Sequence, residues 1–196
     1  MSKCYCMNRS CLTVIGLFLS VILITFSNVN AKEKSSLPTK GEKIENFELK
    51  TLEDKTVKLH DVTKEGPVVL LVLRGYPGYQ CPLCTFQVAD FVSKADEFKE
   101  LKATVLLVYP GPADDLKSKA KQFTKRIKLP RNFKMLLDPD YHFLNQYDLR
   151  WDAKRETSYP STFVIDQKNI VTFSKVSKSH GGRTRAKAVL KAVKGS

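Results

Sequence analysis

Two cysteines separated by two residues, Cys81 and Cys84, are the side chains of this sequence best suited to chemistry. A thiolate is a nucleophile, and a nearby second thiol can close a disulfide with it. Pro82 favours the first position of a helix, where the N–H that proline lacks would have no partner. Cys81 would then cap a helix, whose unpaired N–H groups and dipole stabilise a thiolate. We predict that Cys81 attacks a substrate and that Cys84 resolves the product.

Two structural uses of the pair fit the sequence less well. A disulfide across a loop of about four residues stabilises a fold by only about 2 kcal/mol, so the pair would be a weak crosslink. A zinc site needs about four ligands, and the sequence has no second C-x-x-C and no H-x₃₋₅-H. We therefore predict a thiol-dependent oxidoreductase with no metal and no bound cofactor.

The elements around the dithiol are expected to alternate between strands and helices. The continuously apolar residues 68–73 predict a strand buried on both faces, directly before the dithiol. Apolar residues then recur at helical spacing, including Phe86 and Phe98, which predicts one helix that begins at the cysteines. A second apolar strand covers residues 104–109, and residues 114–127 predict an exposed lysine-rich helix.

The remaining elements complete an α/β fold, a central mixed sheet with helices on both faces and an N-terminal hairpin. Turn residues and alternating apolar residues place them as follows. We expect an edge hairpin at 47–49 and 56–59, a strand at 133–137, a short helix at 141–147, a hairpin at 162–166 and 170–173, a turn at 180–182 and a final helix at 183–193.

The N-terminal segment, residues 1–31, has the layout of a signal peptide. It lacks acidic residues, carries Lys3 and Arg9 early, runs apolar over residues 11–26 and ends in small residues up to Ala31. We predict cleavage near Ala31 and a periplasmic or secreted protein. The alternative is an uncleaved membrane anchor, with the domain still facing outside the cytoplasm.

Cleavage would leave about 165 residues, enough for one domain with a single core. We expect a flexible lead-in at residues 32–43 and the folded domain at residues 44–196. Cys4, Cys6 and Cys11 would leave with the signal peptide, so that the mature chain keeps only the dithiol. An oxidising compartment would allow this pair to hold a disulfide.

The formal net charge of +13 comes from Lys and Arg spread along the whole chain. Nucleic-acid binding is usually accompanied by basic residues gathered on one face or in one motif, which this sequence lacks. We therefore expect a solvated basic surface and no nucleic-acid partner. A membrane partner is expected only if the N-terminal segment is uncleaved.

Two segments resemble a known family. Residues 74–84, RGYPGYQCPLC, are similar to the dithiol block of the peroxiredoxin-like branch of the alkyl hydroperoxide reductase and thiol-specific antioxidant family. Residues 159–166, YPSTFVID, resemble the segment that holds the cis-proline facing the dithiol in thioredoxin-fold proteins. The resemblance spans about residues 40–193. It implies a thioredoxin-like fold in which Pro160, like Pro82, shapes the site.

Two departures from the family pattern leave the reaction open. Typical peroxiredoxins show P-x-x-x-T-x-x-C around the reactive cysteine, whereas the corresponding positions here are Arg74 and Gly78. They also tend to place an arginine where this chain has Pro160. The resemblance implies reduction of hydroperoxides through a Cys81 sulfenic acid, whereas the departures favour reduction of protein disulfides. Either reaction needs an external thiol electron donor, such as a thioredoxin-like protein.

Four further side chains are candidates for the site. Arg74 follows the core strand and could lower the pKa of Cys81 or orient a peroxide, or it could be an ordinary surface arginine. Tyr79 and Gln80, next to Cys81, could contact substrate or pack against the protein. Arg150 could reach the same pocket from its loop or remain exposed.

The alternative from a different functional class is a non-catalytic binding module with this fold. Such a module would not need two thiols at this spacing.

Overall fold

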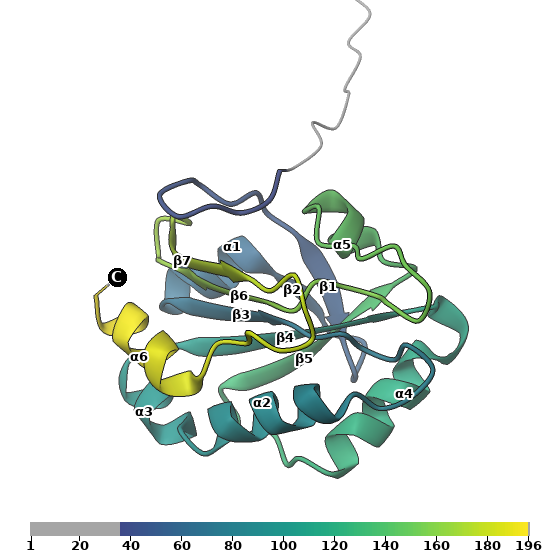
Figure 1. The fold of residues 1–196 in the computed structure, drawn as a ribbon. Helices are drawn as coiled ribbons and strands as arrows, with labels where there is room; N and C mark the ends of the chain where they lie inside the picture. The colour runs from purple at the N-terminus through teal and green to yellow at the C-terminus, as the bar shows by residue number, and fades with distance from the viewer. Residues whose placement is uncertain (1–35, 196) are drawn as a thin grey trace, which may run out of the picture. The chain divides into compact units, whose positions relative to one another are not determined.

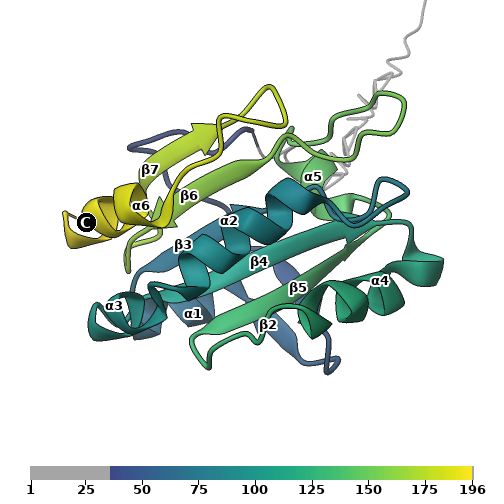
Figure 2. The same cartoon turned by 60° about the horizontal axis from the view of Figure 1, so that its bottom comes forward.

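A computed structural model describes residues 36–195 of the chain, which form a seven-stranded sheet with helices on both faces (Figures 1 and 2). The predicted signal peptide lies outside the described residues. The strands are β1 (Glu48–Thr51), β2 (Thr56–Lys58), β3 (Val68–Val72), β4 (Thr104–Gly111), β5 (Phe133–Pro139), β6 (Ser161–Ile165) and β7 (Val171–Val176). The helices are α1 (Leu59–Glu65), α2 (Pro82–Val92), α3 (Ala95–Glu100), α4 (Ala113–Lys125), α5 (His142–Gln146) and α6 (Ala186–Lys194).

The sheet is mixed, in the order β2-β1-β5-β4-β3-β6-β7. The strands β3, β4 and β5 are parallel to one another, whereas β6 pairs with β3 in the antiparallel direction. The hairpin β1–β2 lies at one edge and β6–β7 ends the sheet at the other. The predicted mixed α/β sheet with an N-terminal edge hairpin is confirmed.

The strand β3 separates two hydrophobic cores. All five of its residues are buried, with Val69 and Leu71 in one core and the alternate residues Val68, Leu70 and Val72 in the other. This alternation follows from the two-residue period of a strand. Helices α2, α3, α4 and α6 cover the first face, and α1 and α5 cover the second (Figure 1). The dithiol therefore follows the carboxyl end of a central strand, at the sheet edge where the parallel strands end.

The predicted single helix after the dithiol is wrong, because the structure divides it into α2 and α3. The buried residues of α2 are Cys84, Gln87, Val88 and Phe91, a stripe of positions i, i+3, i+4 and i+7. Phe86 lies two positions from Cys84, about 200° around the helix, and its side chain is 70% exposed. Its predicted place on the core face is therefore also wrong.

Two boundaries near the N-terminus differ from the prediction. The second strand of the hairpin ends at Lys58, and Leu59 begins the short helix α1. Residues 38–43, predicted as part of a flexible lead-in, instead attach to β7: Gly41 N–H donates to the Val171 carbonyl over 2.8 Å, and the Ser174 hydroxyl donates to the Pro38 carbonyl over 2.8 Å. The packed part of the chain begins before Ile44.

None of the helices in residues 36–195 combines the length and the apolar character that a membrane span requires.

Candidate active site

The dithiol lies where the sequence placed it, at the start of α2. Cys81 is the N-cap residue, Pro82 occupies the first turn and Cys84 follows within that turn. Both cysteines are free thiols and both are only 1% exposed. The backbone N–H of Arg74, at the end of β3, donates to the Cys84 sulfur over 3.4 Å. The core strand and the helix therefore fix the position of the second sulfur directly.

The loop between β3 and the dithiol packs tightly against the end of β4. Gly75 has a positive φ of 64°, and a Cβ at this position would collide with the Pro110 carbonyl oxygen. Only glycine fits both conditions without strain. The close approach brings the loop over β4, where Tyr109 donates its hydroxyl hydrogen to Gln80 Oε1 over 2.9 Å.

Arg183 brings a positive charge to both sulfurs from a distant part of the chain. Its Nη2 lies 3.5 Å from Cys84 Sγ and 3.9 Å from Cys81 Sγ. Its Nη1 donates to Gln87 Oε1 over 2.9 Å, and its Nε donates to the His180 carbonyl over 3.1 Å. These bonds fix the guanidinium over the dithiol. The sequence prediction did not include Arg183, because no local pattern distinguishes it from the other basic residues near the C-terminus.

The two thiols have opposite pKa shifts. A hydrogen bond from the Cys84 thiol is the largest effect on Cys81, and together with the positive charges of Arg183 and Arg74 it outweighs burial and lowers the pKa of Cys81 to about 5. Burial is the largest effect on Cys84 and, with the neighbouring Cys81, raises the pKa of that thiol well above 9.0. At neutral pH, Cys81 is a thiolate and Cys84 is a hydrogen-bond donor to it.

A buried ion pair lies beside the dithiol. The Arg74 side chain is 3% exposed, and its Nη2 donates to Glu156 Oε2 over 2.8 Å. The other carboxylate oxygen, Oε1, bonds to His180 Nε2 over 2.8 Å, and the Trp151 ring packs near that imidazole with 5.3 Å between ring centres. Glu156 therefore joins the end of β3 to the segment that carries Arg183.

The match to known proteins agrees with this geometry. The model of the AhpC/TSA family matches residues 40–174. The chain belongs to this family. It is 31% identical to the peroxiredoxin Bcp of Bacillus subtilis over 65% of this chain and 78% of that protein. It is also 30% identical to the chloroplastic peroxiredoxin Q of Triticum aestivum, over 69% of this chain and 58% of that protein.

Solved structures show the same fold at low sequence identity. The peroxidoxin BcpB of Mycobacterium tuberculosis aligns with a TM-score of 0.62 and 22% identity, covering 81% of this chain and 97% of that one. The peroxiredoxin PrxQ of Xylella fastidiosa, solved as a mutant, aligns with a TM-score of 0.64 and 19% identity, over 81% and 96% of the two chains. These structures confirm the expected thioredoxin-like fold. The family match and the peroxiredoxin relatives confirm the enzyme class, a thiol-dependent oxidoreductase. Arg183 lies beyond the residues that the family model matches.

Two of the predicted site residues lie near the sulfurs. Arg74 is buried, which excludes the alternative of a surface arginine. Its positive charge helps to lower the pKa of Cys81, although Glu156 and the Tyr79 hydroxyl engage its guanidinium. Arg74 Nη1 donates a hydrogen bond to the Tyr79 hydroxyl over 3.0 Å, and Tyr79 is 46% exposed. It is therefore placed both to position Arg74 and to meet a partner.

Gln80 and Arg150 have structural roles in this AhpC/TSA chain. The Gln80 amide is engaged at both ends, by the Tyr109 hydroxyl and by the Lys119 carbonyl at 2.9 Å. Arg150 donates to the Trp151 and Thr157 carbonyls over 2.6 Å and 2.5 Å and lies over the Tyr141 ring. The prediction that these two side chains contact substrate has no support in this geometry.

The cis-proline that the resemblance implied is absent, since the described residues contain no cis peptide bond. Pro160 still contributes to the surroundings of the site, because its carbonyl accepts the Ser177 N–H over 2.9 Å at the start of the segment that leads to Arg183. The preceding residues brace the end of β3: Ser158 donates to the Leu73 carbonyl over 2.8 Å, and Thr157 donates to the Arg74 carbonyl.

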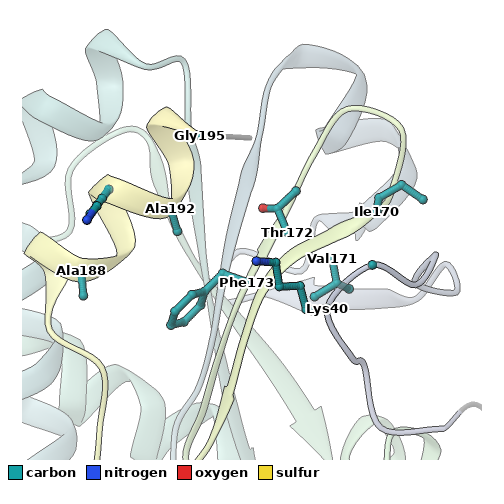
Figure 3. Close-up of a pocket in the computed structure, with 10 residues that line it drawn as sticks. Lys40, Ile170, Val171, Thr172, Phe173, Ala188, Ala192 and Gly195 are labelled. Atoms are coloured by element: carbon teal, nitrogen blue, oxygen red, sulfur yellow. The ribbon is translucent and has the colours of Figure 1, made fainter.

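One cavity lies beside the loop that leads to the dithiol, and another lies away from the site. A cleft of about 500 Å³ is lined by the loop before the dithiol, including Tyr76, and by the start of α4. A second, of about 550 Å³, lies between β7 and α6, where Phe173, Ala188 and Lys40 line it (Figure 3). Neither of these two cavities includes Cys81 or Cys84 in its lining.

Proposed function

We propose that this protein reduces hydroperoxides, with Cys81 as the attacking sulfur and Cys84 as the resolving one. The Cys81 thiolate attacks one peroxide oxygen, the O–O bond breaks, and the leaving alkoxide or hydroxide takes up a proton. Cys81 then carries a sulfenic acid. The Cys84 sulfur attacks it, a disulfide forms, and the sulfenic oxygen leaves as water with the Cys84 proton. An external dithiol returns both sulfurs to the reduced state.

The observation that carries this proposal is a stabilised thiolate that is almost fully buried. Cys81 is 1% exposed, yet its pKa is lowered to about 5. A hydroperoxide is small enough to approach such a sulfur, whereas a protein disulfide has to align its two sulfurs in line with the attacking one. Burial therefore favours a small oxidant for the first step.

This chain has Gly78 at the position where the family pattern has a threonine hydroxyl, and two arginines lie near the sulfurs instead. The guanidinium of Arg183 lies within 4 Å of both sulfurs, and Arg74 contributes its charge from the other end of the loop. A guanidinium can stabilise the negative charge that develops on the leaving oxygen. We infer that these cations replace the missing hydroxyl in binding the peroxide.

Resolution requires little movement. Cys84 donates a hydrogen bond to Cys81, so the two sulfurs already lie within one turn of each other at the start of α2. The raised pKa of Cys84 keeps it protonated, and therefore unreactive, until Cys81 is oxidised. This arrangement favours rapid closure of the disulfide over further oxidation of the sulfenic acid.

The test is a single-turnover oxidation by hydrogen peroxide. For this test Cys4, Cys6 and Cys11 are replaced by serine, which leaves Cys81 and Cys84 as the only thiols of the protein. We expect loss of free thiol at least about a hundred-fold faster than for a small-molecule thiol of equal thiolate concentration. Cys81→Ser should abolish the reaction, whereas Cys84→Ser should retain it and accumulate a sulfenic acid.

The second candidate function is reduction of protein disulfides. It is favoured by the C-x-x-C spacing at a helix N-terminus and by the absence of a hydroxyl at Gly78. A peroxide rate no better than that of the control thiol would support this alternative. Cys84→Ser should then trap a mixed disulfide between Cys81 and a protein substrate.

We also propose that the protein acts outside the cytoplasm, after cleavage near Ala31. The support is the sequence of residues 1–31 and a mature chain whose only cysteines form the redox pair. N-terminal sequencing of the protein recovered from the periplasm or the medium should find Lys32 as the first residue. Recovery of the intact N-terminus in the membrane fraction would support the uncleaved anchor, and recovery from the cytosol would contradict export.

A further inference from the structure

The amide of Gln87 is a buried polar group beside the dithiol that the proposed reaction does not use. Gln87 follows Cys84 by three positions on α2, so the two side chains lie on the same face of the helix, and the residue is 8% exposed. Its Oε1 accepts a hydrogen bond from Arg183 Nη1 over 2.9 Å, and its Nε2 donates to the Thr184 carbonyl over 3.3 Å. Both ends of one amide therefore tie the dithiol helix to consecutive residues of the segment before α6.

This bond sets the position of the Arg183 guanidinium relative to the sulfurs. The second bond of the guanidinium runs from Nε to the His180 carbonyl, which lies only three residues away and belongs to the same segment as Arg183. Gln87 belongs instead to α2, the helix that also carries Cys84. Because the acceptor and the sulfur are on one rigid element, the bond to Gln87 fixes the distance of 3.5 Å between Arg183 Nη2 and Cys84 Sγ.

The acceptor that holds Arg183 is uncharged. Among residues 36–195, Arg183 forms no ion pair with a carboxylate. Two carboxylates of the surrounding region, those of Glu156 and Asp90, bond instead to Arg74 and His180 and to Ala186 and Arg185. A carboxylate at position 87 would cancel the charge of Arg183 and repel a thiolate, whereas an amide does neither. The charge of Arg183 is therefore left to act on the dithiol.

We propose that Gln87 is a positioning residue of the redox site, whose neutral amide holds the Arg183 guanidinium against the two sulfurs without cancelling its charge. The proposal rests on the proposed function in one respect, the assignment of Cys81 as the attacking sulfur. It requires two separate properties of the side chain, an acceptor oxygen at the right distance and the absence of charge. Substitutions at position 87 can change each property by itself.

The experiment is a double-mutant cycle read by the titration of Cys81, in the full chain with Cys4, Cys6 and Cys11 replaced by serine and with no peroxide present. Thiolate absorbance at 240 nm is followed against pH, with Cys81→Ser as the blank. Gln87→Met keeps the length of the side chain and loses the acceptor, so it should raise the pKa of Cys81 from about 5 by about half a unit. In an Arg183→Met background the same change should shift the pKa by less than about 0.2, because Gln87 acts only through Arg183.

Gln87→Glu tests the absence of charge. It keeps an acceptor oxygen for Arg183, but it should raise the pKa of Cys81 by about one unit, more than Gln87→Met does. Both variants lose the donor to the Thr184 carbonyl, so the difference between them comes from the group that faces Arg183.

A second variant and a control separate positioning from a general effect on folding. Gln87→Asn keeps the amide on a side chain one methylene shorter, and it should shift the titration as Gln87→Met does. The matched control is Gln146→Met, the same substitution in α5 on the other face of the sheet, which should leave the titration midpoint unchanged. Urea unfolding shows that each variant is folded at the pH of the titration.

Three results would overturn the proposal. The first is a wild-type midpoint in both Gln87→Met and Gln87→Asn, and the second is an equal shift for Gln87→Met with and without Arg183. The third is a wild-type midpoint in Gln87→Glu, which would show that charge at this position does not reach Cys81. Failure of the proposed function has a different signature, a slow reaction in the single-turnover test with peroxide, and it would leave these titrations as expected.

Discussion

At the scale of single residues, two chemically identical side chains have opposite properties because of their positions on one helix turn. Cys81 caps α2, accepts a hydrogen bond from Cys84 and lies near two guanidinium groups, all of which favour the thiolate. Cys84 lies inside the first turn, where burial favours the neutral thiol. The proposed assignment of Cys81 as the attacking sulfur and Cys84 as the resolving one is based on this difference in solvation and charge.

Arg183→Met should raise the pKa of Cys81 by about one unit, because it removes the nearest positive charge. The measurement is the thiolate absorbance at 240 nm as a function of pH, with Cys81→Ser as the blank. In the wild type, the thiolate signal and the rate with peroxide should both fall as the pH drops through about 5. They should be constant between about pH 6 and pH 8.

Arg183→Lys should restore part of the effect, since it keeps the charge but loses the bonds to Gln87 and His180. The matched control is Arg131→Met, an exposed arginine just before β5, at the opposite end of the parallel strands from the dithiol. An identical titration midpoint in wild type and Arg183→Met would show that Arg183 does not act on Cys81.

At the scale of elements, the short helix α5 depends on a buried carboxylate. Asp138, at the end of β5, accepts the N–H groups of Phe143 and Leu144 over 2.7 Å and 3.2 Å. These bonds satisfy donors that a helix start leaves free. Burial is nevertheless the largest effect and raises the pKa of Asp138 to about 6. Ionisation of this buried carboxyl therefore lowers the stability of the folded protein, and the size of the loss depends on pH.

Folded protein holds the Asp138 proton up to about pH 6, whereas an unfolded aspartate loses it near 3.8. The wild type should therefore lose stability from this group as the pH rises from about 4 to 6. Asp138→Asn does not titrate, so its free energy of unfolding relative to wild type should rise by about 2 to 3 kcal/mol between pH 4 and pH 7. Urea unfolding at the two pH values measures this difference.

Val189→Ala provides the control for this pH dependence. Val189 is buried in α6, in the core on the other face of the sheet from α5, so its destabilisation relative to wild type should be the same at both pH values. A pH-independent difference for Asp138→Asn would show that Asp138 has the same pKa in the folded and unfolded states.

At the scale of the whole molecule, the site is assembled from segments far apart in the sequence. The dithiol follows β3, Glu156 lies in the loop before β6, and Arg183 precedes α6. Glu156 connects them by bonding Arg74 and His180 with its two oxygens. Breaking one partner of a buried ion pair leaves an uncompensated charge, so these contacts hold the segments in one arrangement.

Much of this organisation could be predicted because it depends on local patterns. Proline after Cys81 predicts a helix start, and the continuous apolar run before it predicts the buried strand β3. Alternation of apolar residues predicts the edge hairpin. The division between α2 and α3 and the exposure of Phe86 could not be read in this way, because an apolar residue satisfies a helical period on more than one face.

The sequence by itself determined the dithiol, its place at a helix N-terminus and the mixed α/β sheet, since caps and hydrophobic periods act between neighbouring residues. Only the tertiary structure decided that Arg183 reaches the sulfurs, that Arg74 is buried against Glu156, and that Gln80 and Arg150 serve the loops. Such contacts join residues up to about a hundred positions apart. They depend on the path of the backbone through the whole sheet, which no local pattern encodes.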